Sequence, residues 1–373
     1  MATTYPEVKV SGSPLERGGQ YGEQARDRIA CSLEMYGRAY KDLAGLEWTA
    51  ATSYAGRFAE AIRAFEPRYL DEMRAIADGS GQELDSILAL NVRTEIMLSA
   101  EARKSRAADV ATPPAECTTI TAVSAVTDSG HTLVAQNWDW LPETVETLVV
   151  LAASPDKGPS YVTVVEAGLL AKTGLNSCGL GVATNALITS SDSGAVGVPY
   201  HVSLRALLEA ESLPAAIASL ERCGRSSSAN YMLAMPGGMA VDLEARPGAS
   251  GELVTIEPTG GVLVHTNHFV ATPLVEDVGL SWAPDSPARY ARVARLLASR
   301  KGAISLELLE EVLRDHAGYP NSICAHLDEA DKPSEQGRTA ASLVMDLEER
   351  CIWLAEGNPC RANYRRLEAI RSS

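Results

Sequence analysis

The chain of 373 residues contains no run of 18 consecutive apolar residues, so no segment is long enough for a transmembrane helix. Its first residues, MATTYPEVKV, lack the basic and apolar stretches of a secretory signal, and its last three, RSS, differ from the peroxisomal SKL signal. The seven cysteines are an odd number, and they form neither a CxxC pair nor a zinc-finger spacing. Such a pattern indicates reduced thiols rather than a disulfide framework. We therefore expect a cytoplasmic protein with no membrane partner.

Positive charge is also scarce. The 33 Lys and Arg residues are outnumbered by 48 Asp and Glu residues, which gives a formal net charge of −15. A surface of this sign repels the phosphates of nucleic acids, so we expect no nucleic-acid partner. With 46% apolar and 22% charged residues the composition is that of an ordinary folded protein.

The common cofactor motifs are missing too. CGLGVA lacks the third glycine of a dinucleotide fingerprint, and neither GxSxG nor GxxxxGK[ST] occurs. His265 and His268 offer half of a metal site, but no HExxH or carboxylate cluster accompanies them. Arg289, Arg292 and Arg295 recur at helical spacing and are predicted to form a solvated helix face. We expect neither a cofactor nor a metal.

The N-terminal part of the chain is patterned as helix. From Pro14 to about Ala100 the sequence is rich in Ala, Glu, Arg and Leu at helical spacing, with breaks at Pro67 and at Gly79–Gly81. Residues 101–116 lose this periodicity and contain a Pro-Pro pair, which is typical of an exposed linker.

The pattern changes to β-strand after residue 116. Short β-type segments follow one another, among them CTTITAVSAV, HTLVAQNWDW, ETLVVLAA and YVTVVEAG, and the chain closes with ASLVMDL and CIWLAEG. Helices are predicted between them, two around 201–222 and one each at about 287–300 and 305–315. We predict two domains, a helical segment with its linker over 1–116 and a β-rich region over 117–373.

Cys117 opens the first of these strands, directly after the linker. A thiol there can attack the carbonyl of Glu116, and hydrolysis of the resulting ester frees an α-amine with an ordinary pKa of about 7.7–8.0. That amine can act as general base for the thiol, so one residue supplies nucleophile and base. On position alone a buried structural thiol is the more ordinary interpretation, because free cysteines are among the most buried residues.

The strand QNWDW carries a second group of candidates. Alternation places Asn137 and Asp139 on one face and Trp138 and Trp140 on the other. If this strand pairs with that of Cys117, Asp139 can orient the new α-amine and the tryptophans can wall a substrate pocket. An Asp that closes a turn beside two core tryptophans is an equally good interpretation.

Asn267 is the third candidate, because it follows a Val-rich strand in VHTNH. A side-chain NH₂ at a strand end can stabilise an oxyanion, a role worth about 2.7–4 kcal/mol in other enzymes. The alternative role is to cap the loop.

Taken in order, ECTT, QNWDW, EAG, GLNSCGLGVATNAL, GVPYHVSLRALLE, SSSANYML, VHTNH, DSPARYAR and GYPNSIC resemble the acyl-coenzyme A:6-aminopenicillanic acid acyltransferase family. The resemblance extends from Cys117 to about Cys324. These are N-terminal nucleophile hydrolases, so it implies an α+β fold, a four-layer αββα sandwich, preceded here by a helical pro-segment. The resemblance favours Cys117 as nucleophile.

By the same resemblance Cys117 is both the self-cleavage and the catalytic nucleophile, Asp139 supports its amine, and Asn267 supplies the oxyanion hole. Ser228 and Arg338 then match substrate-site positions of the family. Glu116 departs from the family, in which the penicillin enzyme has Gly before the nucleophile, and this bulkier charged residue is expected to slow self-cleavage.

We predict a self-processing amidase that hydrolyses a small N-acyl amide through a thioester on Cys117. Hydrolysis is favoured because the sequence has neither a phosphate-binding loop nor the positive charge that coenzyme A would attract. The first alternative is an acyltransferase that moves an acyl group from coenzyme A or an amide to a small amine, with an acyl thioester as substrate. The second is an uncleaved, non-catalytic binding protein. The expected partners are the small substrate and the alpha and beta fragments of one precursor, with a homo-oligomer as a further option.

Overall fold

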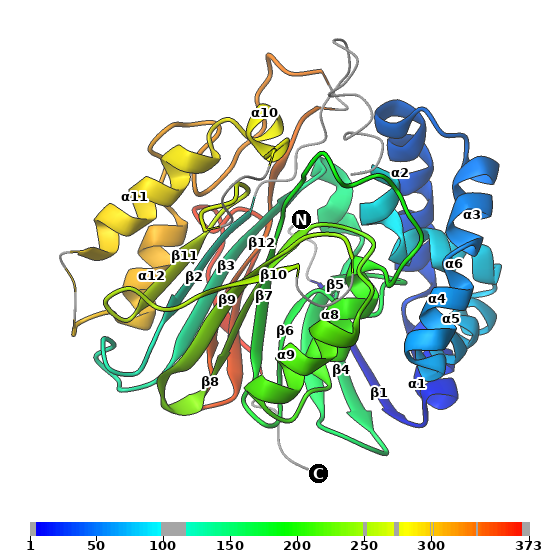
Figure 1. Ribbon diagram of the computed structural model, residues 1–373, viewed down its shortest axis with the longest axis horizontal. Helices are drawn as coiled ribbons and strands as arrows, with labels where there is room; N and C mark the ends of the chain where they lie inside the picture. The colour runs from blue at the N-terminus through cyan, green and yellow to red at the C-terminus, as the bar shows by residue number, and fades with distance from the viewer. Residues whose placement is uncertain are drawn as a thin grey trace.

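The computed structural model of this protein describes residues 5–97, 117–248, 252–271, 276–298, 300, 302–332 and 335–367. Two β-sheets lie face to face between helical layers, which is the four-layer αββα sandwich implied by the resemblance (Figure 1). None of the helices in these ranges is both long and apolar enough to cross a membrane.

The two sheets have different sizes. One has eight strands in the order β1-β4-β5-β6-β7-β8-β9-β10, and the other has six in the order β11-β2-β3-β12-β13-β14. The strands of the larger sheet are β1 (Glu7–Gly12), β4 (Leu148–Pro155), β5 (Tyr161–Glu166), β6 (Thr173–Asn176), β7 (Gly181–Ala186), β8 (Ala229–Met235), β9 (Met239–Ala245) and β10 (Leu253–Ile256). Those of the smaller sheet are β2 (Cys117–Ala122), β3 (Leu133–Trp140), β11 (Val262–His265), β12 (Arg338–Asp346), β13 (Cys351–Glu356) and β14 (Arg365–Arg366).

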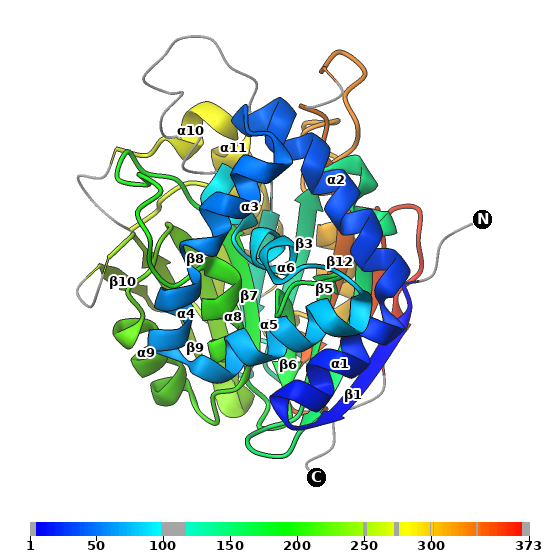
Figure 2. The ribbon, with the colours of Figure 1, turned by 90° about the vertical axis from the view of Figure 1, so that its right-hand side faces the viewer.

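Helices cover the outer face of each sheet. The helices numbered up to α9 form the layer on the side of the eight-stranded sheet, where α1, α8 and α9 contact its strands, and α11 and α12 contact the six-stranded sheet (Figures 1 and 2). The first group is α1 (Pro14–Gln24), α2 (Arg26–Ala44), α3 (Trp48–Gly56), α4 (Ala59–Phe65), α5 (Pro67–Ser80), α6 (Leu84–Asn91), α8 (Tyr200–Leu208) and α9 (Leu213–Arg222). The others are α10 (Gly279–Trp282), α11 (Ser286–Ala298) and α12 (Leu306–Leu313), with short 3₁₀ turns at Pro142–Glu146 and Pro236–Gly238.

The helical prediction for the N-terminal part is confirmed over the described residues. Helix α5 begins at Pro67, whose fixed φ suits a first helical turn, and ends at Ser80, followed by a capping Gly81 with a φ of 73°. Helices α1 and α5 then cross very closely, because a Cβ on Gly18 would lie 2.5 Å from the carbonyl oxygen of Glu72. Glycine at this crossing therefore lets two backbones touch.

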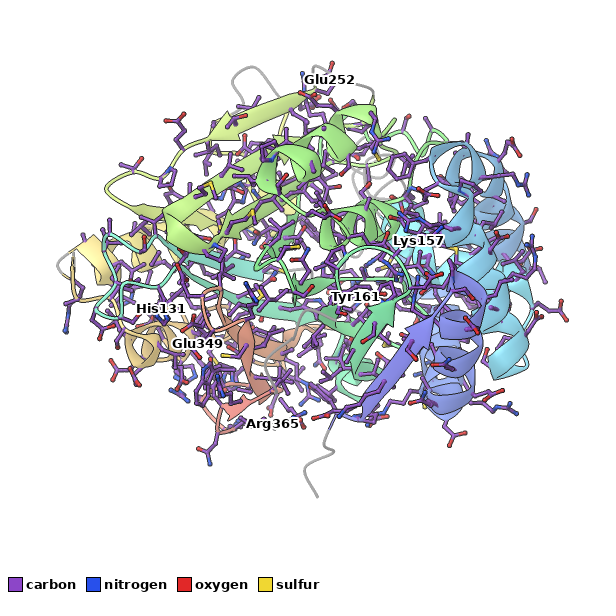
Figure 3. The ribbon with its side chains drawn as sticks, turned by 90° about the horizontal axis from the view of Figure 1, so that it is seen from below. His131, Lys157, Tyr161, Glu252, Glu349 and Arg365 are labelled. Carbon is purple, nitrogen blue, oxygen red and sulfur yellow. The ribbon has the colours of Figure 1, made fainter. Side chains whose placement is uncertain are left out.

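Strand β1 was not predicted from the sequence. It runs parallel to β4, so the N-terminal segment contributes a strand to the larger sheet. The same segment reaches the smaller sheet, since the hydroxyl of Tyr5 donates to the carbonyl of Ala340 at 2.5 Å. Arg365 adds a third link, from β14 to Glu7 of β1 at 3.2 Å, at the edge labelled in Figure 3. Residues near the N-terminus thus contact both sheets.

The centre of the smaller sheet is the part that positions the candidate site. Strands β2 and β3 form the predicted antiparallel pair, with Cys117 opposite Trp138. Strand β12 adds to the other side of β3 and places Thr339 opposite Asp139. The two sheets meet across this region, where Thr119 of β2 donates to Asn185 of β7 at 2.7 Å. Cys117 lies two residues before Thr119, so its side chain faces the larger sheet as well.

Candidate active site

The backbone of Cys117 is held at both its ends. Its N–H donates to Oδ1 of Asn267 at 2.7 Å. Its carbonyl oxygen accepts from Nδ2 of Asn185 at 3.0 Å and from Nη1 of Arg289 at 2.8 Å. These partners come from β7, from the loop after β11 and from α11, so three separate elements fix the first residue of β2.

The thiol of Cys117 is 3% exposed, and burial raises its pKa. The positive charge of Lys172 acts in the opposite direction, as does the backbone N–H of Asp139, which points at the sulfur. The carboxylate of Asp139 opposes thiolate formation. Asp139 and Lys172 are therefore the charged groups with the strongest effect on this thiol.

Asp139 lies on β3 as the sequence predicted, with a side chain that is 2% exposed. Among the described residues, neither carboxylate oxygen has a hydrogen bond of standard geometry. Burial raises the pKa of Asp139 to about 7, although the nearby hydroxyl of Thr339 and the guanidinium of Arg289 lower it. The group thus changes charge near neutral pH.

Lys172 was missed by the sequence analysis. It lies between β5 and β6 and is 4% exposed, with Nζ 3.1 Å from the hydroxyl of Tyr200 and above the rings of Trp138 and Tyr200. Burial lowers its pKa to about 8. A lysine within the apolar stretch GLLAKTG was the available signal, because lysine is almost never fully buried without a reason.

The prediction that Arg289 belongs to a solvated face is wrong. Arg289 is 2% exposed and binds the carbonyl of Cys117, while its Nη2 donates to Oδ1 of Asn267 at 3.0 Å. Its Nε donates to Asp285 at 2.5 Å. The prediction holds better for Arg292 of the same helix, which lies near the surface and is paired with Asp315. Helical spacing cannot tell which member of a stripe meets a buried site.

Asn267 lies in the site, but with an orientation that the sequence did not specify. Its carbonyl oxygen faces the nitrogen of Cys117, and its Nδ2 donates to the carbonyl of Ala186 at 3.1 Å. The backbone N–H of Asn267 donates to Oγ of Ser286 at 2.7 Å. An amide nitrogen carries two hydrogens, and among the described residues only one hydrogen bond from Nδ2 is found, that to Ala186.

Two of the predicted substrate-binding residues, Ser228 and Arg338, form hydrogen bonds with residues that do not contact Cys117 in the interactions described above. The hydroxyl of Ser228 donates to Asp192 at 2.6 Å. Arg338 donates to the carbonyl of Pro142 at 3.0 Å. Their substrate-binding roles stay predictions, and Glu116, the other half of the predicted cleavage site, lies outside the described residues.

The two predicted pocket tryptophans lie on the face of β3 expected from alternation. Trp138 packs against Lys172, whereas Trp140 donates from Nε1 to the hydroxyl of Tyr36 at 2.8 Å. The two histidines considered as half of a metal site bind separate residues. His265 forms a hydrogen bond with Glu244 at 3.1 Å, and His268 forms one with Ser286 at 2.8 Å. The rings of His265 and His268 thus have separate partners rather than a shared ligand position.

Two facing β-sheets between helical layers form the αββα sandwich of the N-terminal nucleophile enzymes, and Cys117 is the first residue of β2 in this sandwich. The family model of acyl-coenzyme A:6-aminopenicillanic acid acyl-transferase matches residues 126–361, and the chain belongs to that family. The acyl-coenzyme A:6-aminopenicillanic-acid-acyltransferase 40 kDa form of Emericella nidulans is 29% identical over 358 residues, which are 94% of this chain and 92% of the relative.

Two solved structures that are similar to this chain share little of its sequence. Penicillin V acylase from Agrobacterium tumefaciens is 15% identical, with a TM-score of 0.43 over 64% of this chain and 83% of that one. A mutant conjugated bile acid hydrolase from Clostridium perfringens is 13% identical, with a TM-score of 0.42 over 69% of this chain and 98% of that one.

Proposed function

We propose that this protein is a self-processing amidase that cleaves a small N-acyl amide through a thioester on Cys117. The observation that carries the proposal is the way Cys117 is held, with an amide oxygen on its nitrogen, the backbone N–H of Asp139 directed at its sulfur, and a buried carboxylate, that of Asp139, whose charge raises the pKa of the thiol. A structural cysteine needs none of these groups.

Self-processing would begin when the sulfur of Cys117 attacks the carbonyl carbon of Glu116. The new C–S bond replaces the peptide C–N bond, and the thiol proton passes to the nitrogen that becomes the α-amine. Water then hydrolyses the ester, which leaves a carboxylate on Glu116 and a free thiol on Cys117. Oδ1 of Asn267 already accepts from this nitrogen at 2.7 Å, so it would hold the new amine in place.

Turnover would use the thiol and the new α-amine of Cys117 together with the side-chain amide of Asn267. The α-amine takes the thiol proton while the sulfur adds to the substrate carbonyl, and the amine then returns the proton to the leaving nitrogen. A side-chain N–H of Asn267 can stabilise the oxyanion. Lys172 would favour the thiolate, and Asp139, with a pKa of about 7, would stabilise the protonated amine when it is ionised. Water finally releases the acyl group from the thioester.

Acyl transfer is the second candidate function. It differs only in the last step, in which an amine rather than water attacks the thioester. The relative in Emericella nidulans favours it, because that protein is named an acyl-coenzyme A:6-aminopenicillanic-acid-acyltransferase and matches 94% of this chain. The formal charge of −15 opposes binding of a multiply phosphorylated donor, so we retain hydrolysis as the first candidate.

A substrate screen on processed protein tests both candidates. N-acyl amides of different chain length are offered with and without a small amine acceptor, and both the free acid and the new amide are measured. Hydrolysis predicts free acid regardless of the acceptor, whereas transfer predicts that new amide replaces it. Cys117→Ala should form neither product. Turnover by that variant would overturn the proposal.

A further inference from the structure

A cluster of four side chains lies outside the candidate active site and has no role in the proposed chemistry. It joins the segment after α12 to the turn after β13. Its ligand atoms all lie within 4.8 Å of one another, and they belong to His316, Cys324, His326 and Cys360.

Four of the six distances between the ligand atoms match tetrahedral coordination. Zinc bonds of about 2.3 Å to sulfur and about 2.0 Å to nitrogen separate two sulfurs by roughly 3.7 Å, two nitrogens by roughly 3.3 Å, and a sulfur from a nitrogen by roughly 3.5 Å. The sulfurs of Cys324 and Cys360 are 3.6 Å apart, and Nε2 of His316 is 3.1 Å from that of His326. The two sulfurs lie 3.5 and 3.4 Å from Nε2 of His326.

The surroundings of the sulfurs also suit a metal site. Both cysteines are free thiols. Nδ2 of Asn358 lies 3.6 Å from Sγ of Cys324 and donates to the carbonyl of Ala325 at 2.6 Å. N–H groups directed at a sulfur stabilise its thiolate form, which is the form that binds metal. Tyr319 packs against both imidazoles and covers one side of the cluster.

We propose that these four residues bind one Zn²⁺ ion in a structural Cys₂His₂ site. Two thiols and two imidazoles form the ligand set that zinc prefers, and the two thiol protons are released on binding. Four protein ligands leave no position for substrate, so the site is structural rather than catalytic. The sequence motif is HxxxxxxxCxH followed 34 residues later by Cys, which no standard zinc-finger spacing describes.

The position of the site gives it a specific structural task. Ala325 lies between two of the ligands and exchanges hydrogen bonds with Thr339, each of 3.0 Å. Thr339 in turn faces Asp139 across the sheet. The segment leading to the ligands is also held by Asn137, which donates to the carbonyls of Leu313 and Ile323. The ion would therefore fasten the loop that closes one side of Asp139.

Metal analysis of the full-length protein, purified without chelator, tests the proposal. We expect about one zinc per chain, and Co²⁺ added to the chelated, reduced protein should give the thiolate charge-transfer and tetrahedral d–d bands of a Cys₂His₂ site. Removing zinc with dipicolinate should lower Tm by several degrees, and added zinc should restore it.

Variants separate this site from chance metal binding. Cys360→Ser and His316→Ala should each lose the cobalt spectrum, and both change residues on the exposed side of the cluster. Cys31→Ser removes another exposed thiol, on α2, and should keep the spectrum. Reduced, folded wild-type protein that takes up neither zinc nor cobalt would overturn the proposal, as would a spectrum unchanged in Cys360→Ser. A Cys324–Cys360 disulfide as the only native state would overturn it too.

Discussion

Two buried charged clusters of this protein differ in how their charges are paired. Between α1, α5 and α8, Glu72 lies 2.8 Å from Arg17 and 2.9 Å from Arg205, and Arg205 also binds Glu209 at 2.8 Å. Around Cys117, no described residue gives Asp139 a hydrogen bond of standard geometry, and the hydrogen bond of Lys172 goes to a neutral hydroxyl. Burial is similar in the two clusters, but ion pairing is not.

The pKa directions follow from this difference. Burial alone would raise the pKa of Glu209, yet Arg205 and Arg68 hold it below its ordinary range. The pKa of Asp139 rises to about 7 and that of Lys172 falls to about 8, so both move toward their neutral forms. The paired charges of Glu209 and Arg205 stay ionised near neutral pH, whereas the pKa values of Asp139 and Lys172 lie close enough to neutral pH for these groups to gain or lose a proton. Unpaired buried charge is therefore the better indicator of a reactive site.

Replacing the thiol should have the largest effect on the reactive cluster. Cys117→Ala should lower turnover by roughly 10⁴–10⁶-fold and abolish self-cleavage, with little change in Tm, because the nucleophile is lost while the packing is kept. Steady-state kinetics and thermal unfolding measure the two effects. Cys178→Ala is the matched control and should retain wild-type turnover.

The paired cluster should respond in the opposite way. Glu72→Gln leaves buried Arg17 without a carboxylate and Arg205 with that of Glu209 alone, and it should lower the free energy of unfolding by about 3–5 kcal/mol. The pH dependence of turnover by the folded fraction should not change. Glu60→Gln breaks an exposed pair with Arg63 and should cost at most about 0.5 kcal/mol in the same denaturant titration. Equal losses in the two variants would contradict the comparison.

Two buried asparagines, Asn267 and Asn91, should differ in whether their replacement lowers kcat or stability. Asn267→Ala should lower kcat by about 10²–10³-fold with a smaller change in KM, because its N–H acts when charge develops on the carbonyl oxygen. The kinetics must use protein shown by mass to be cleaved. Asn91 makes three hydrogen bonds, to the backbones of Ile87, Gly168 and Leu170, so Asn91→Ala should lose stability and keep kcat. Unchanged kcat in stable, processed Asn267→Ala would remove Asn267 from the chemistry.

The smallest expected effect concerns Lys172. Its positive charge opposes the rise in the pKa of Cys117, so Lys172→Met should raise that pKa further. The rising limb of the kcat/KM profile should then move to higher pH by roughly one unit. Lys157→Met, on the exposed turn between β4 and β5, should leave the profile in place. A profile that does not move in Lys172→Met would place the lysine in packing alone.

The local parts of the site could be predicted from the sequence because they lie on one hairpin. The strand pattern paired β2 with β3, and the turn between them brought Asp139 to Cys117. Asn185, Lys172 and Arg289 come from three other elements, and their approach depends on how sheets and helices pack. Single-sequence periodicity contains no information on such distant contacts.

Two other features, strand β1 and the proposed zinc ligands, were not predicted from the sequence for related reasons. Strand β1 precedes a long helical stretch, and its pairing partner β4 lies about 140 residues further along the chain. The proposed zinc ligands lie on two loops whose spacing matches no standard motif, so the expectation of no metal rested on motif searches alone.

We propose that Cys117 becomes the N-terminal nucleophile of a processed enzyme. Intact mass of the purified protein under denaturing conditions, with N-terminal sequencing of the fragments, tests it most directly. Self-cleavage predicts chains of 116 and 257 residues, the second beginning with Cys117 and Thr118, and one uncleaved chain for Cys117→Ala. A single full-length wild-type chain that turns over an N-acyl amide would contradict it.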